Sequence, residues 1–274
     1  MYRTSISNIA WGNVDEAPYL EYVASKGLHG IEFAPSVRWE EPVNTSGKER
    51  SEYRNKIESF GLKIVSLHAL LYARSDLMMF SSKELRSGTA EYLVSLASLA
   101  ASLGCGLMVL GSPKNRTIGD MKKEEADKIA EDFFYKISDK ISKYQVVLCI
   151  EPLSNIESDY INNHLEGINL VKNINHPNFR LMLDVKSMYL AGENFKDAFK
   201  KSESFLEHIH VNDPDNKPPG STGVDHSIIA AALRQCSYDK TLSLEVGRSS
   251  GEPMDNVQKS IDVLLKTYCQ RNND

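Results

Sequence analysis

Four short apolar runs in the second half of the chain each end in an acidic or imidazole side chain. The first run reaches Glu151, directly before Pro152, and the later runs reach Asp184, His210 and Glu245. Apolar runs of this length are typical of strands buried on both faces. Pro152 cannot donate to a β-ladder, so it ends the first of these strands beside Glu151. Packing alone gives no reason for such a group at four strand ends.

Three carboxylates and one imidazole form a donor set dominated by oxygen. Such a set suits Mn²⁺, Mg²⁺, Co²⁺ or Zn²⁺ and leaves positions for a chelating substrate. An ion bound to a ketone oxygen and the neighbouring hydroxyl would acidify the C–H between them and stabilise the resulting enediolate. For any single residue, a helix cap or a pair with Lys or Arg is the simpler explanation. That explanation is harder to sustain for four residues at matching positions.

The remaining sequence predicts the scaffold that brings these strand ends together. Around Gly27, Gly61 and Gly104, a helical stretch reaches a glycine suited to a left-handed cap and passes into a β-type run. We predict strands at 3–9, 28–33, 62–68, 106–110, 145–150, 179–184, 206–211 and 241–245. We predict helices at 15–26, 47–60, 83–103, 122–143, 163–174, 193–204, 226–236 and 253–269. This alternation favours an α/β fold, a single-domain (β/α)8 TIM barrel over residues 1–274, with the strand ends meeting at one mouth. An open doubly wound sheet is the alternative, but no Gly-x-Gly-x-x-Gly follows the first strand.

Composition argues against several classes of protein. The formal net charge of −5 does not suit a nucleic-acid groove, and no apolar stretch approaches the roughly 20 residues of a membrane span. The first residues lack the apolar segment of a secretory signal, so we expect a cytoplasmic protein. Cys105 and Cys149 lie in apolar runs and are interpreted as core residues, because the cysteines show no metal-binding spacing.

Several motifs together resemble the xylose isomerase-like barrel superfamily, and within it the branch of sugar-phosphate isomerases and ketose 3-epimerases. They are Glu151-Pro-Leu, Leu183-Asp184, His208-Ile-His210-Val-Asn-Asp213, Pro219-Gly220 and Leu244-Glu245. The resemblance covers the whole chain in order and implies a metal-dependent isomerase of carbohydrate metabolism with a small sugar as substrate. It also implies that Glu151, Asp184, His210 and Glu245 bind one divalent ion, commonly Mn²⁺. Glu151 and Glu245 would exchange the proton next to the carbonyl.

Two positions depart from the family pattern. Family members usually carry Asp-x-x-His after the sixth strand, whereas this chain has Asp184-Val-Lys186-Ser187. They also often carry an arginine in the loop after the seventh strand, where this chain has Lys217. Lys186 or Lys217 could replace these contacts and bind an acidic or phosphorylated sugar. The alternative is that both lysines are solvated.

Five further residues are candidates for the site. Glu157 matches a family position that orients substrate near the metal. His68 ends the third strand and could contact substrate or a second ion, or form a structural hydrogen bond. Trp11 could form an apolar wall for a sugar ring or pack in the barrel rim. Glu32 could bind substrate or brace a loop, and His208 should lie deeper on the seventh strand in a structural role.

Three other functions remain open. The same enediolate can expel a β-hydroxyl, which would make the protein a dehydratase. An abasic-site endonuclease of the same superfamily would need extra histidines, where this chain has Ser187 and Gly111-Ser112. A barrel that only binds a ligand is the third. We expect no nucleic-acid or membrane partner, and a homo-oligomer is compatible with the sequence.

Overall fold

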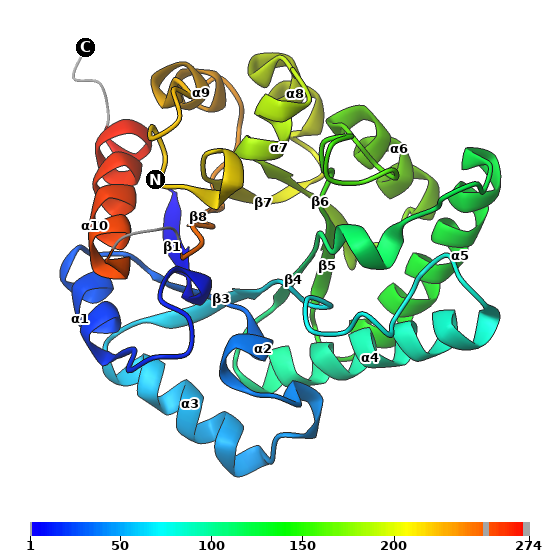
Figure 1. Ribbon diagram of the computed structural model, residues 1–274, viewed down its shortest axis with the longest axis horizontal. Coiled ribbons are helices and arrows are strands. Elements are labelled where there is room, and N and C mark those ends of the chain that lie inside the picture. The colour runs from blue at the N-terminus through cyan, green and yellow to red at the C-terminus, as the bar shows by residue number, and fades with distance from the viewer. Residues whose placement is uncertain (1, 249–251, 271–274) are drawn as a thin grey trace.

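Eight parallel strands form a closed barrel, as the sequence predicts. The computed structural model describes residues 2–248 and 252–270. Strands pair in chain order and β1 pairs with β8, so the ring of strands lies inside a ring of helices (Figure 1). The strands β1 to β8 are Arg3–Ser7, Gly30–Phe33, Lys63–Leu67, Leu107–Leu110, Val147–Ile150, Phe179–Asp184, Leu206–Val211 and Thr241–Leu244. The predicted (β/α)8 barrel is confirmed.

Each predicted helix has a counterpart in the structure. The counterparts are α1 (Ala17–Ser25), α3 (Gly47–Ser59), α4 (Lys83–Ser102), α5 (Lys123–Ser142), α6 (His164–Ile174), α8 (Phe195–Ser202), α9 (His226–Leu233) and α10 (Pro253–Val263). A π-helical segment, Leu264–Cys269, continues α10. Two short helices were not predicted, α2 (Pro35–Arg38) and α7 (Val185–Leu190). The α7 helix begins where the Asp184 side chain accepts the Ser187 N–H at 2.7 Å, which caps its first turn.

The repeated glycines stop helices as the sequence indicates. Gly27, Gly61 and Gly104 have φ angles of 75°, 75° and 74°, the left-handed conformation that costs other residues more than glycine. At the opposite end of α3, Ser46 and Glu49 form a reciprocal capping box. These local signals set where each helix ends and the next strand can enter the barrel.

The buried apolar residues form two clusters. Val109, Cys149 and Met182 form a small cluster of their own, with Leu107 and Val147 packed against it. A much larger cluster, which contains Cys105, is formed by apolar residues of the strands and helices. Both cysteines are buried, which confirms their interpretation as core residues. Within the described ranges, no helix combines the length and apolar character that a membrane span requires.

Candidate metal centre and active site

The carboxyl ends of β5 to β8 bring together the four residues of the predicted metal site. Glu151 directly follows β5, Asp184 ends β6, His210 lies in β7 and Glu245 directly follows β8. One ligand atom from each residue lies within 4.8 Å of the others. The side chains of Asp184 and His210 are fully buried, whereas that of Glu245 is 14% exposed. The closed barrel therefore assembles this group at its carboxyl-terminal mouth.

His210 lies between the three carboxylates. Its Nδ1 atom is 3.7 Å from Glu151 Oε1, 3.6 Å from Asp184 Oδ2 and 3.4 Å from Glu245 Oε2. This buried nitrogen has no hydrogen-bond partner of acceptable geometry among the described residues. A nitrogen without a partner that faces three carboxylates matches the donor set of a divalent ion. The residues present therefore fit the metal that the sequence predicts.

Asn212 is a site residue that the sequence analysis missed. Its side-chain amide donates to Asp184 Oδ2 at 2.8 Å and to Glu245 Oε2 at 3.3 Å. It is fully buried and so fixes two carboxylates relative to each other. The signal that could have found it is the strand period of two, which puts His208, His210 and Asn212 on one side of β7 and its exit.

Gly111 provides the space that the Glu151 side chain occupies. A Cβ atom at position 111 would lie 2.3 Å from Glu151 Oε2, far inside van der Waals contact. The Glu151 N–H donates to the Leu110 carbonyl at 3.1 Å, which extends the β4–β5 pairing up to the site. The carboxylate after β5 therefore requires a glycine after β4, because any larger residue at position 111 would collide with it.

The two glutamates differ in their electrostatic surroundings. Burial raises the pKa of Glu151, and the nearby Glu245 carboxylate raises it further against the opposing effect of His210. Burial would also raise the pKa of Glu245, but contacts with His210 and His68 lower it far below its usual value. Without a bound ion, Glu245 is thus the ionised partner and Glu151 the one that more readily carries a proton.

A cavity of about 480 Å³ opens above this group. Glu151 and Glu245 both line it, so a small molecule in the cavity can reach their carboxylates. The volume is within the range of ordinary small-molecule sites. Its lining residues come from the segments that follow β3, β4, β5, β6, β7 and β8: His68, Ala69, Tyr72, Gly111, Ser112, Pro113, Lys114, Asn115, Glu151, Leu153, Glu157, Lys186, Asn216 and Glu245.

Lys186 and Glu157 form an ion pair in the cavity wall. The Lys186 Nζ atom lies 2.8 Å from Glu157 Oε1, and the hydroxyls of Ser154 and Ser187 each donate to Glu157 Oε2 at 3.0 Å. Ser187, which stands where the family pattern has histidine, thus holds Glu157. Burial would lower the pKa of Lys186, but the carboxylates of Asp184, Glu245 and Glu157 raise it above its usual value. Lys186 therefore carries its charge inside the cavity and is not solvated.

His68 lies beside the four-residue group. Its Nδ1 atom is 3.2 Å from Glu245 Oε1, and its Nε2 atom is 2.5 Å from the Ser7 hydroxyl. The ring also lines the cavity. The structure therefore combines both interpretations of His68, because the imidazole has structural partners and still faces the space above the site.

Trp11 and Lys217 agree with the second of their two interpretations, packing in the barrel rim and exposure to solvent. The Trp11 side chain has no exposed surface and stacks on Tyr19 with ring centroids 5.3 Å apart, so it packs inside the barrel rim. Lys217 is half-exposed, and its Nζ lies 3.5 Å from Asp215. Neither residue is among the described residues that line the cavity, although the neighbouring Asn216 is. The bend after β7 turns Asn216 inward and leaves the Lys217 ammonium at the surface.

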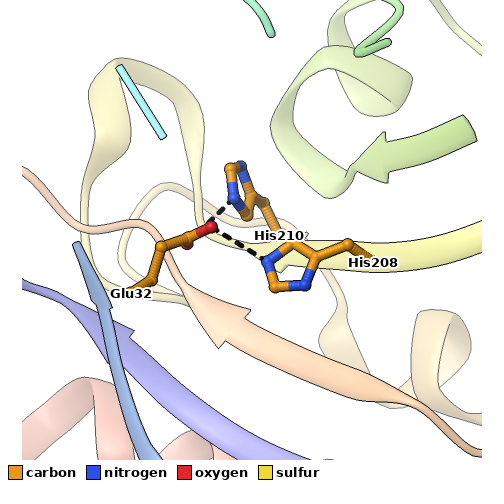
Figure 2. A group of neighbouring side chains, drawn as sticks. All are labelled: Glu32, His208 and His210. Carbon is orange, nitrogen blue, oxygen red and sulfur yellow. Dashed lines mark ion pairs between the residues drawn. The ribbon is translucent and has the colours of Figure 1, made fainter. Parts of the chain in front are cut away.

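Glu32 lies beneath the site, in contact with two histidines (Figure 2). Its carboxylate is 3.1 Å from His208 Nε2 and 3.0 Å from His210 Nε2, and all three side chains are fully buried. Burial would raise the pKa of Glu32, but the His210 and His208 imidazoles hold it well below its usual range. Glu32 does not line the cavity, so it braces β7 rather than a loop. His208 lies deeper than His210, as predicted.

The xylose isomerase-like TIM barrel family matches residues 20–267 of this chain. The chain belongs to this family. Among curated relatives of this xylose isomerase-like barrel, D-psicose 3-epimerase of Agrobacterium fabrum is 29% identical over 109 residues. That match covers 40% of this chain and 38% of the epimerase, so it spans well under two thirds of the relative's length.

Solved structures similar to this family member cover nearly all of the chain. A D-psicose 3-epimerase crystallised with D-fructose has a TM-score of 0.79 at 18% identity and covers 98% of this chain and all of its own. A structure of IolI protein with a bound zinc atom also has a TM-score of 0.79, at 17% identity, and covers 99% of this chain and all of its own. At these identities the likeness shows a shared fold.

Proposed function

We propose that this protein is a metal-dependent sugar epimerase that moves a proton at the carbon next to the carbonyl of a small ketose. The observation that carries this proposal is the pairing of Glu151 and Glu245 across His210, at strand ends that face one cavity. The names of the curated relatives, which are ketose 3-epimerases, support the same reaction. A single divalent ion, Mn²⁺ by preference, would be held by Glu151, Asp184, His210 and Glu245.

The two glutamates supply the proton transfer that an epimerase needs. Because its pKa is lowered, Glu245 is ionised and available to accept a proton from carbon, whereas Glu151, whose pKa is raised, more readily holds the proton that is returned. The resulting intermediate is a planar enediolate, so return of the proton to the other face inverts the carbon. When bound, a divalent ion supplies Lewis acidity that stabilises the negative charge of this intermediate.

Lys186 and Lys217 give little support for an acidic sugar. Glu157 neutralises Lys186, and the Lys217 ammonium lies at the surface, so neither lysine offers an unpaired charge to an acidic group. An ammonium has three N–H donors, and Glu157 takes one of those of Lys186. We propose that Lys186 donates to sugar hydroxyls with the others, while the Glu157 carboxylate accepts from the same ligand and the His68 ring packs beside it. Buried free thiols at Cys105 and Cys149 support a reducing, cytoplasmic setting.

Deuterium exchange tests this function against its main alternative. Protein loaded with Mn²⁺ is incubated with a panel of neutral ketoses in D₂O, and the C–H signals are followed by NMR. An epimerase places deuterium at the carbon next to the carbonyl and produces the epimer. A dehydratase instead yields a product that has lost water, and a ligand-binding barrel causes no exchange with any sugar. Either of the last two outcomes overturns the proposal, with metal-stripped protein as the control.

A further inference from the structure

Glu32 has four polar partners that come from three other strands. The Ser66 and Ser243 hydroxyls donate to its two oxygens at 2.8 and 2.7 Å, and the His208 and His210 rings lie at 3.1 and 3.0 Å. A buried carboxylate with this many partners keeps both its charge and its position. Glu32 is therefore a rigid anion one layer below the proposed metal ligands.

The contact with Glu32 distinguishes the two nitrogens of the His210 ring. Nε2 lies 3.0 Å from Glu32 Oε2, whereas Nδ1 lies 3.4 to 3.7 Å from the three carboxylates above it. A neutral imidazole carries its proton on one nitrogen and a lone pair on the other. Because Glu32 Oε2 lies closer to Nε2 than any carboxylate oxygen lies to Nδ1, the single proton of a neutral ring is held at Nε2, and Nδ1 keeps the lone pair that a metal ion needs.

We infer that Glu32 is a positioning residue that sets the tautomer and orientation of His210 for metal binding through Nδ1. This inference rests on the metal site of the proposed function, but it does not depend on the reaction or the substrate. Glu32 is absent from the cavity lining, so its effect on a ligand above must pass through His210. Outer carboxylates of this kind change metal affinity by about 10- to 100-fold when they are removed.

A second ion held directly by Glu32, His208 and His210 is the competing explanation, since their ligand atoms also lie within 4.8 Å of one another. The two serine hydroxyls already occupy the Glu32 oxygens, which favours the positioning role. The two explanations differ in metal stoichiometry. A positioning residue leaves about one ion per chain, whereas a ligand of a second ion gives two.

The test is metal titration of Glu32→Gln, with Glu16→Gln as the matched control. Glu16 is also a buried carboxylate, but its partners are Tyr53 and Lys56, away from the site. We expect Glu32→Gln to bind Mn²⁺ at least about tenfold more weakly than wild type. Glu16→Gln should bind as wild type does. Nitrogen NMR of the metal-free proteins, recorded at a pH high enough to leave His210 neutral, should show its proton at Nε2 in wild type and a mixture of tautomers in Glu32→Gln.

Each outcome of this experiment has a distinct meaning. Wild-type affinity and an unchanged tautomer in Glu32→Gln would overturn the inference and leave the metal site intact. Two ions in wild type, with one lost in Glu32→Gln, would make Glu32 a ligand and also overturn it. If the wild-type protein binds no Mn²⁺, the metal dependence in the proposed function and this inference both fail. If Glu32→Gln fails to fold, Glu32→Asp keeps the charge but withdraws it from His210, and the same loss of affinity is expected.

Discussion

The Lys186 ammonium and the Glu157 carboxylate lie 2.8 Å apart in the wall of the cavity. This pair changes what Lys186 can do, because a lysine already neutralised by a carboxylate gives little selectivity for an acidic sugar. The Ser187 hydroxyl fixes the other oxygen of Glu157. Ser187, at the position of the family histidine, therefore holds the pair in place.

Replacing Lys186 with Met should lower kcat/KM for neutral ketoses by about tenfold or more, equivalent to about 1.4 kcal/mol. The variant loses a hydroxyl donor and leaves Glu157 without its cation. Lys217→Met is the matched control and should change nothing, since its ammonium lies at the surface beside Asp215. Steady-state kinetics on neutral and phosphorylated sugars measure both effects. A loss of kcat/KM confined to acidic or phosphorylated sugars would instead support the anionic substrate that the sequence suggested.

His210→Ala should release the metal ion. Purified wild type is expected to hold about one divalent ion per chain, because four ligands of this kind leave positions for substrate oxygens. His176→Ala provides a control, since His176 contacts the Asn178 backbone outside the site. Elemental analysis of dialysed protein gives the occupancy. Full occupancy in His210→Ala would remove His210 from the proposed ligand set.

Glu151→Gln and Glu245→Gln should each lose at least about 10²-fold in kcat, the lower end of general acid–base contributions. An amide keeps the shape of each side chain but cannot carry the proton. Each variant should still exchange solvent deuterium into one of the two epimers, because one base remains. Metal content is measured alongside. A metal-loaded variant with nearly full activity would exclude the two-base epimerase and favour a one-base isomerase or a lyase.

Gly111→Ala should weaken metal binding by displacing Glu151. The added Cβ would lie 2.3 Å from Glu151 Oε2, so either the carboxylate or the loop after β4 must move. We expect Mn²⁺ affinity to fall at least about tenfold, in line with other changes next to metal ligands. Gly88→Ala is the control, because no atom outside its helix backbone lies within 4 Å and alanine should stabilise α4 by up to about 1 kcal/mol. Unchanged affinity in Gly111→Ala would show that Glu151 is free to shift.

Asp213→Asn should lower the free energy of unfolding by about 2 kcal/mol near neutral pH. Asp213 accepts hydrogen bonds from the backbone N–H groups of Gly220 and Thr222 and contacts His226 Nε2 at 2.7 Å. Burial would raise the pKa of Asp213, but the bonds from His226, Thr222 and Gly220 lower it. This stabilisation is therefore fully present above the pKa of about 4 that Asp213 has in the unfolded chain. It is lost as the pH falls through the lower pKa of Asp213 in the folded state.

Urea denaturation at pH 5 and pH 3 tests the sign of this effect. The difference in free energy of unfolding between wild type and Asp213→Asn should be smaller at pH 3 than at pH 5, because the wild-type carboxylate begins to take up its proton at pH 3. Asp225→Asn is the control, because Asp225 caps α9 from an exposed position and asparagine caps helices equally well. A larger difference in free energy of unfolding at pH 3 than at pH 5 would contradict the lowered pKa of Asp213.

Local sequence determined the barrel and the identity of the four clustered residues. Helix caps at Gly27, Gly61 and Gly104 act over a few residues, and buried parallel strands read as apolar runs whatever their neighbours are. A polar residue that ends such a run faces the mouth once the barrel closes. Glu151 and Glu245 could therefore be chosen from the sequence without knowledge of any contact.

Closure of the barrel decided everything that depends on partners far apart in the chain. Glu32 meets the Ser243 hydroxyl across 211 residues, and it meets His210 because β2 and β7 face the same interior. No local pattern encodes such a pairing, since it depends on how far each strand is shifted against the next around the ring. Trp11 is buried in the rim and Lys186 lines the cavity only because segments distant in the chain pack around them.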